Sequence, residues 1–413
     1  MLNSLRIVGF KSLAMKAPVE LAPLTVLFGP NAVGKSNFID AVQVFSRLAS
    51  ERTLADALSE PVRGRALETF SLPAGGLPAL LEQERATFVL EATIERSTRR
   101  MLYKAEVAVS PRTGRLSVSD EFLAQLTGKR TVLGDPRLEV VDGQIRVRRR
   151  KRGKPLFEHL GQAFTQLSDR RFTGRDYDVI EQAREELSSW KAYYLDPRMA
   201  MRSARGPEEV SDIGPSGERI GPFLFRLKGQ EPKAYDSVRR IFKTLVPSVQ
   251  DLAVDVDPKR GVIDIDIIQR GTPFSARVAS EGTLRVLALA CVACNPWGGS
   301  LVAIEEPENG VHPRRIELIA RMLLSLSTDE PGPRQVLVTS HSPVFCGAVS
   351  RLANEQPDSI ALYRVGLSKG STELVRFQPS GPLFQDVELR EALTTPSEEQ
   401  VFDALARRGL LDE

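Results

Sequence analysis

The sequence predicts an α/β fold with a mixed, largely parallel sheet, an antiparallel β subdomain and an inserted region of helices and a β-hairpin. Near the start, the apolar run "LTVLF" leads through a glycine-containing loop into the helix-spaced "KSNFIDAVQVFSRLA". In the C-terminal third, the apolar runs "SLVAIEE" and "RQVLVTS" alternate with helix-like segments, which is typical of a parallel sheet covered on both faces. From about Arg85 the pattern changes to period two, which indicates antiparallel strands.

Length and composition indicate a water-soluble protein of several compact parts. A chain of 413 residues is longer than one core usually supports, so we expect two or three compact units. Its hydrophobic content of 42% and charged content of 26% are ordinary for globular proteins. The longest apolar runs fall short of the roughly 18 residues of a membrane span, and no signal peptide is visible. We therefore expect a cytoplasmic protein that does not bind membranes.

The remaining elements can be placed in chain order. "LNSLRIVGF" alternates like a strand, and "ATFVLEATIE", "MLYKAEVAVS" and "GRLSVS" form a predicted meander. Asp142-Gly143 is a typical hairpin turn because both residues tolerate positive φ. Two helix-like segments follow, "LFEHLGQAFTQL" and "DVIEQAREELSSW".

Beyond the Pro/Gly/Arg-rich "YYLDPRMAMRSARG", the helical period returns in "ERIGPFLFRLKG" and "AYDSVRRIFKTLV", and a strand pair follows in "DLAVDVDPKRGVIDIDIIQR". We expect residues 96–235 to be an insertion into an α/β domain that is built from residues 1–95 and 236–413.

The loop between the first apolar strand and its helix fits a phosphate-binding loop, Gly29-x4-Gly34-Lys35-Ser36. Glycines let backbone N–H groups surround phosphates, Lys35 can reach the β and γ oxygens, and Ser36 can ligate Mg²⁺. The predicted nucleotide-binding residues are Gly29, Pro30, Asn31, Ala32, Val33, Gly34, Lys35, Ser36 and Asn37.

A second half-site follows the buried strand "SLVAI" as two adjacent carboxylates, Glu305 and Glu306. Ligands collect at the carboxyl edge of a parallel sheet, so Glu305 can hold the metal and Glu306 can polarise an attacking water. The alternative is a solvated acidic turn. His341 follows the strand "QVLVTS" and is predicted to touch the γ-phosphate, the alternative being a helix cap. His312 is interpreted as a structural residue, and His159 as a packed or surface residue.

The motifs "GPNAVGKSN", "SEGT", "EEPENGVHP" and "TSHSP", in this order, resemble those of ABC-type AAA-family ATPases of the RecF/SMC/OLD group, especially their short stand-alone members. The resemblance covers roughly residues 1–50 and 190–345 and implies an ABC-type P-loop ATPase head. It places Glu305 and Glu306 in Walker B and Asn309 in the D-loop, and it makes His341 the switch histidine.

The same resemblance implies an ATP-sandwich homodimer, with larger oligomers left open. Ser280, Glu281 and Gly282 would form the signature, which caps the γ-phosphate bound by the other subunit. Taken alone, "SEGT" is a plain helix N-cap. The signature lacks the full LSGGQ form, Glu305 stands where aspartate is common, and no Q-loop is assigned. These departures weaken a transport-cassette interpretation more than a RecF-like one.

Three functions remain open. The first is an ATP-gated dimeric switch that uses ATP and Mg²⁺ and acts on DNA or with a separately encoded effector in prokaryotic defence. The second is a RecF-like repair or recombination ATPase, and the third is a transport cassette. We expect no nuclease activity, because the residues after His341 are too few for a Toprim domain and contain no Asp-x-Asp.

A basic run follows the predicted hairpin on a chain whose net charge is only +3. Its cationic residues are candidates for contact with nucleic-acid phosphates: Arg146, Arg148, Arg149, Arg150, Lys151, Arg152 and Lys154. The alternatives are a solvated loop or a contact for an acidic protein, since no aromatic residue interrupts the run to stack on bases.

Overall fold

The computed structural model describes residues 1–150, 153–329, 332–368 and 370–377. The chain forms two compact units. Among the described residues, unit 1 contains residues 1–22, 31–191 and 365–375, and unit 2 contains residues 23–30, 192–364 and 376–377. One boundary between the units therefore falls inside the glycine loop.

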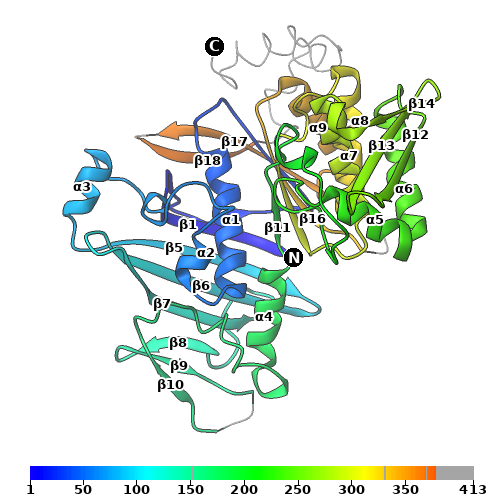
Figure 1. Cartoon of the computed structure of the whole chain (residues 1–413). Helices are drawn as coiled ribbons and strands as arrows, with labels where there is room; N and C mark the ends of the chain where they lie inside the picture. Colours follow the sequence, from blue (N-terminus) through cyan, green and yellow to red (C-terminus); the bar gives the residue numbers. More distant parts are fainter. Residues whose placement is uncertain (151–152, 330–331, 369, 378–413) are drawn as a thin grey trace. The chain divides into compact units, whose positions relative to one another are not determined.

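Unit 1 is built on a sheet in which the order of strands is β10-β9-β8-β7-β6-β5-β1-β2-β18, with β3 paired to β1 (Figure 1). The strands are β1 (Leu2–Phe10), β2 (Leu13–Ala14), β3 (Val19–Glu20), β5 (Ala86–Arg96), β6 (Arg99–Ser110), β7 (Arg115–Leu126), β8 (Leu138–Val141), β9 (Gln144–Val147), β10 (Leu156–His159) and β18 (Ser371–Phe377). Strands β5 to β10 pair antiparallel with their neighbours, so the predicted meander and the Asp142-Gly143 hairpin are confirmed.

One predicted helix in this unit is wrong. Within "LFEHLGQAFTQL" the structure has the strand Leu156–His159, followed by turns. The strand pairs with Gln144–Val147, and Gly161 then takes a positive φ of 87°. Tertiary pairing therefore overrides the helical spacing of Leu156, Leu160 and Phe164.

The helices of unit 1 are α1 (Lys35–Ser50), α2 (Leu54–Ala57), α3 (Gly76–Glu82) and α4 (Asp178–Ser188). Helix α1 lies against the sheet, where the ring of Phe45 stacks on that of Tyr103 with centroids 5.4 Å apart (Figure 1). Most of α1 is buried. The apolar spacing that predicted this helix therefore marks its packing against the sheet.

Unit 2 contains a second set of strands in the order β17-β4-β16-β15-β11. They are β4 (Leu24–Phe28), β11 (Lys191–Tyr193), β15 (Leu301–Glu305), β16 (Gln335–Ser340) and β17 (Ile360–Ser368). Strands β15, β16, β4 and β17 run parallel, as the apolar runs predicted. Every residue of β4 and β16 is buried, which explains why neither strand alternates between apolar and polar residues.

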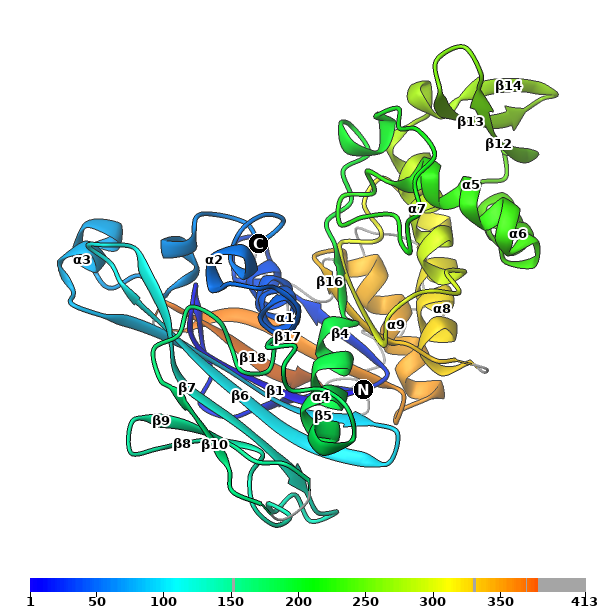
Figure 2. The same cartoon turned by 60° about the horizontal axis from the view of Figure 1, so that its bottom comes forward.

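The helices of unit 2 are α5 (Ile220–Gln230), α6 (Pro232–Leu245), α7 (Glu281–Ala293), α8 (Pro313–Thr328) and α9 (Pro343–Glu355). A small antiparallel sheet of β12 (Asp251–Asp257), β13 (Val262–Gln269) and β14 (Thr272–Ser275) packs beside α5 and α6 (Figure 2). Helix α7 is almost entirely apolar and lies in the core, with Leu287 and Cys291 fully buried.

The two compact units do not follow the expected insertion boundaries. Residue 96 is the last residue of β5, which pairs with β6 along its whole length, and the unit boundary lies at residues 191–192 rather than 235–236. Whether residues 96–235 fold as an insertion stays a prediction. Across the described residues, no helix is long and apolar enough to cross a membrane.

Candidate functional site

The carboxyl ends of three buried parallel strands meet at one edge of the sheet in unit 2. Glu305 is in register with Thr339, and Ser340 is in register with Phe28. The N–H of Gly29, the first residue of the glycine loop, donates to the Ser340 carbonyl oxygen at 3.3 Å. The sheet thus brings the start of the loop, the predicted Walker B carboxylates and the segment that carries the predicted switch histidine to one edge, where ligands of such sheets collect.

Glu306 has an unusual backbone and two side-chain partners. Its φ is +45°, a conformation that costs a non-glycine residue free energy and that is found mostly at functional sites. The Asn309 amide donates to Glu306 Oε2 at 2.5 Å, and His341 Nδ1 lies 2.8 Å from Glu306 Oε1. The backbone N–H of Glu306 donates to the Thr339 carbonyl oxygen at 3.0 Å. Contacts from two motif segments, "EEPENGVHP" and "TSHSP", therefore hold Glu306 in place.

Glu308 is a buried carboxylate next to this group. The Ser340 hydroxyl donates to Glu308 Oε1 at 2.5 Å and accepts the N–H of Ser342 at 3.0 Å. Burial raises the pKa of Glu308, which is only 4% exposed, and the Ser340 hydrogen bond opposes that shift. Among the described residues, no hydrogen-bond partner is found for Glu308 Oε2. These contacts fix the backbone on both sides of His341.

In unit 1 the rest of the glycine loop has the backbone that a phosphate cradle requires. Ala32 and Gly34 have positive φ angles of 64° and 98°. A Cβ on Gly34 would overlap the hydroxyl groups of Thr372 and Ser12, so only glycine fits. Thr372 Oγ1 also donates to the Val33 carbonyl oxygen at 2.8 Å.

The residues present fit a nucleotide with Mg²⁺. Gly34 is the N-cap of α1 and has no side chain to accept the first N–H groups of the helix, which suits an anion. Mg²⁺ prefers hard oxygen ligands, and each unit offers one by itself: Ser36 in the first turn of α1 in unit 1, and Glu305 at the end of β15 in unit 2. No group of three or more metal-binding side chains is found in the described part of the chain. Mg²⁺ does not require one, because it usually keeps waters and binds substrate phosphates.

The residues predicted to form the signature lie at the start of α7. Ser280 is the N-cap, and its hydroxyl accepts the N–H of Thr283 at 3.2 Å. A Cβ on Gly282 would overlap the carbonyl oxygen of Gly310, so this glycine sets the close packing of α7 against the turn after Asn309. Beside these residues lies a cavity of about 460 Å³, which Ser280, Gly282 and Gly310 help to line.

The other two histidines have structural or surface positions. His312 is the N-cap of α8, where its side chain accepts the N–H of Arg314, and His159 lies exposed in β10. The structural interpretation of His312 is confirmed.

Most of the described arginines of the basic run have partners within the chain. Arg146 and Arg148 both pair with Glu139, at 3.2 and 2.6 Å, and Arg150 pairs with Asp178 at 3.3 Å. Arg149 donates to the Tyr177 hydroxyl at 3.1 Å. Lys154 is exposed, and Lys151 and Arg152 lie outside the described residues. The net positive charge of this hairpin is therefore smaller than its sequence implied.

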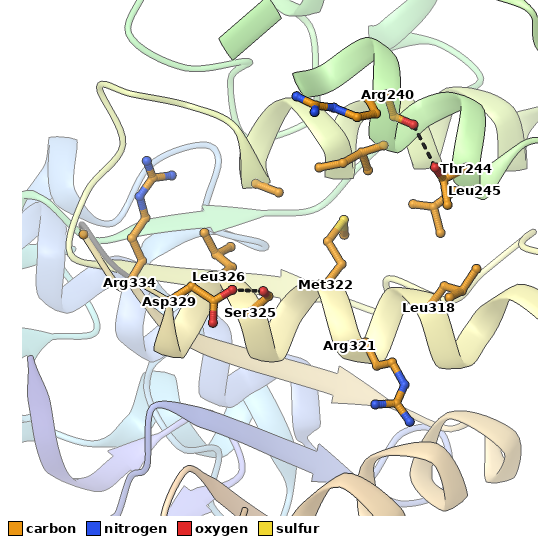
Figure 3. Close-up of a pocket in the computed structure, with 13 residues that line it drawn as sticks. Arg240, Thr244, Leu245, Leu318, Arg321, Met322, Ser325, Leu326, Asp329 and Arg334 are labelled. Carbon is orange, nitrogen blue, oxygen red and sulfur yellow. Dashed lines mark hydrogen bonds between the residues drawn. The ribbon is translucent and has the colours of Figure 1, made fainter. Parts of the chain in front are cut away.

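A larger cavity, of about 620 Å³, lies between α6 and α8 (Figure 3). Met322 and Leu326 point into it from α8, whereas Arg321 points away. None of the described residues that line it belongs to the nucleotide motifs. The size of a cavity therefore does not locate the chemistry in this molecule.

Two features of the site do not follow from the sequence motifs. Glu308 is one, because a carboxylate in an acidic turn is usually solvated; its place two residues after Glu306 is the available signal. Thr372 is the other, since it contacts the glycine loop from 339 residues away and no sequence pattern marks it.

Comparison with known proteins supports this description. The family model described as "AAA domain, putative AbiEii toxin, Type IV TA system" matches residues 24–347, which is more than half of the chain. No curated protein matches.

The chain is also similar in structure to heads of SMC proteins. An Smc head bound to the C-winged helix domain of ScpA matches with a TM-score of 0.52 and 14% identity, covering 91% of this chain and 98% of that one. The Smc head from Pyrococcus furiosus, bound to the C-terminal domain of ScpA, has a TM-score of 0.49 and 13% identity, covering 95% and 99%. The conclusion on the fold rests on the first of these. The chain belongs to the family described as "AAA domain, putative AbiEii toxin, Type IV TA system", and it has the fold of an Smc head.

Proposed function

We propose that this ATPase binds ATP with Mg²⁺, hydrolyses it slowly, and works as an ATP-gated dimeric switch. The observation that carries the proposal is the position of Glu306 at the strand edge where the glycine loop begins, within 2.8 Å of His341. A carboxylate held in this way can accept a proton from an attacking water, which is the main task left to a protein in phosphoryl transfer.

The other residues have separate roles in this proposal. Residues Gly29 to Asn37 surround the phosphates, and Lys35 neutralises their charge. Ser36 and Glu305 hold Mg²⁺. His341 contacts the γ-phosphate when ATP is bound and contacts Glu306 in its absence. The single pair of His341 and Glu306 then couples the state of the nucleotide to the position of the base.

Dimerisation follows from the signature. Ser280 and Glu281 are exposed at the N-terminus of α7, where Glu281 pairs with Arg198 of the same unit. A helix N-terminus favours negative charge, so it suits the γ-phosphate of a nucleotide held by a second subunit.

The proposed setting is prokaryotic defence, with DNA or a separately encoded effector as the target of the switch. The family description supports it, since it names a toxin of a type IV toxin–antitoxin system. Nuclease activity is not part of the proposal. The alternative is a RecF-like repair ATPase, and the genes next to this one would distinguish the two.

The test uses Ser280→Arg, which places a bulky cation where the γ-phosphate of the second subunit would lie. Binding of ATP should persist while the ATP-induced dimer is lost in light scattering. Thr113→Arg, an exposed residue in the β6–β7 turn, is the matched control and should dimerise like the wild type. A dimer that forms equally well in Ser280→Arg would refute the sandwich.

A further inference from the structure

Two large apolar side chains stand out into solvent near the signature. Met199 is 75% exposed and Val278 is 73% exposed, the highest values for large hydrophobic residues in the described part of the chain. Scattered apolar side chains on a surface need no explanation, but two on neighbouring loops beside a functional motif do.

The loop that carries Met199 is held rigidly. Asp196 Oδ1 accepts the N–H groups of both Arg198 and Met199, each at 3.0 Å. The N–H of Met201 donates to the Asp196 carbonyl oxygen at 3.1 Å, and the Met201 side chain is buried. Met199 is therefore exposed by a defined turn.

Hydrogen bonds from Arg202 link this loop to the loop that carries Val278. Its Nε donates to the Pro197 carbonyl oxygen at 2.9 Å, and its Nη1 and Nη2 donate to the carbonyl oxygens of Arg277 and Ala279, both at 2.8 Å. One guanidinium thus binds the carbonyl groups on both sides of Val278. Its planar array of donors suits this purpose, because it holds several acceptors in fixed positions.

The same surface continues into the signature. Ser280 follows Val278 by two residues, and Arg198 pairs with Glu281, the first residue of α7, at 2.6 Å. The two loops and the start of α7 therefore form one connected surface, with Met199 and Val278 as its apolar projections.

Some of the charges near this surface are paired within the chain. Arg260 pairs with Asp264 at 2.5 Å, and Arg277 pairs with the same carboxylate. A surface that binds nucleic-acid backbone keeps an excess of cations, whereas the centre of a protein interface is poor in unpaired charge. The two exposed apolar side chains, Met199 and Val278, favour a protein partner over nucleic acid.

We infer that Met199 and Val278 are apolar anchors through which a second copy of this chain docks in the ATP-bound dimer. The inference rests on the proposed sandwich, since Ser280 would face the second subunit there. Two side chains cover far less than the about 1,200–2,000 Å² that stable interfaces bury. They cannot hold a dimer alone, so their contribution appears only when nucleotide completes the interface.

The test compares dimerisation of a Glu306→Gln parent with that of the same protein carrying Met199→Ser and Val278→Ser. With Mg²⁺ and ATP, sedimentation velocity should show a dimer Kd raised at least about tenfold in the substituted protein, while ATP binding is unchanged. Leu133→Ser, which replaces an apolar residue that is 55% exposed in unit 1, should leave the Kd as it is.

A second measurement guards against misfolding. A thiol introduced by Met199→Cys should react with a maleimide at least about tenfold more slowly when ATP is added to the parent, whereas Leu133→Cys should react equally fast in both states. If the parent dimerises but both substitutions behave like the controls, the inference fails and the sandwich stands. If the parent binds ATP and stays monomeric, both fail.

Discussion

Glu306 and His341 lie 2.8 Å apart, and the Asn309 amide binds the other oxygen of the same carboxylate. Both oxygens of the proposed base therefore have partners in this structure. Each oxygen can still accept a further hydrogen bond, because a carboxylate has about four acceptor sites. The two contacts therefore orient the proposed base and leave it able to bind a water molecule.

Glu306→Gln should retain the shape of the site and the binding of ATP but lose the base. General-base catalysis typically contributes about 10²–10⁴-fold, so we expect ATP turnover to fall by at least about a hundredfold, with dimers accumulating. Phosphate release checks the rate and light scattering checks the dimer. The control is Glu355→Gln, which makes the same change at an exposed carboxylate at the end of α9 and should have neither effect. Turnover at the wild-type rate in Glu306→Gln would remove this residue from the mechanism.

Glu308 and Ser340 should act as positioning residues for His341. Ser340→Ala removes the donor to a buried carboxylate, so we expect kcat to fall several-fold while KM for ATP changes little, because no residue proposed to bind phosphate is altered. Ser340→Thr keeps a hydroxyl and should restore part of the lost rate. If Ser340 only stabilises the fold, the alanine and threonine variants should lose rate in proportion to their loss of thermal stability.

The contact of Gly282 with Gly310 should make position 282 intolerant of any side chain. Gly282→Ala forces the two backbones apart, and overpacking of this kind typically costs about 1–3 kcal/mol, so thermal denaturation should shift down by several degrees. Gly229→Ala is the control, because it lies in α5 with no atom near the new Cβ. An equal Tm in both variants would show that the backbone at Gly310 can move to accommodate a side chain at position 282.

The sequence predicted those parts of the molecule that depend on local pattern. β4 and β16 are continuous apolar runs, and the glycine loop between β4 and α1 has a spacing fixed by the phosphate it would hold. The helix predicted for residues 156–167 was wrong, because the strand found there is specified by its partner at residues 144–147 and not by its own apolar spacing. The ion pairs of Arg148 with Glu139 and of Arg150 with Asp178 were invisible for the same reason, since they depend on strand pairing and on the approach of α4.

Glu121 should make the stability of unit 1 depend on pH. It is fully buried, with the Tyr103 hydroxyl at 3.0 Å and the N–H groups of Gln166 and Leu167 as donors. Burial raises its pKa from 4.5 to about 7, so between these values the folded protein holds a proton that the unfolded chain has lost. The contribution to stability is fully present below pH 4.5 and is lost as the pH rises through about 7.

The free energy of unfolding lost when Glu121 gives up its proton should reach roughly 3 kcal/mol at most. Urea denaturation at several pH values between 5 and 8 measures it, and Glu121→Gln should flatten the dependence because glutamine does not titrate. Glu91→Gln, at a partly exposed carboxylate on β5, should leave it unchanged. A slope that is the same with and without Glu121 would show that other groups set the pH dependence.

Ion pairs within the basic hairpin show which of its cations can reach nucleic-acid phosphates. Arg146 and Arg148 share Glu139, so the described cations most able to reach phosphate are Arg149, Arg150 and Lys154. If the hairpin lies along duplex DNA, replacing these three with Ser should weaken binding and lower the salt slope by about 1 for each phosphate that the protein no longer neutralises.

Basal ATPase activity should survive this change. The matched control removes three exposed cations elsewhere in unit 1 (Arg112, Arg115 and Lys129) and should leave the slope near its original value. Sequence preference should be weak in both proteins, because arginines on a loop contact phosphates more readily than base edges. DNA affinity that the hairpin substitutions leave unchanged would assign the hairpin to a protein partner. Equal weakening in the two triple variants would show that the charge acts without regard to where it lies on the surface.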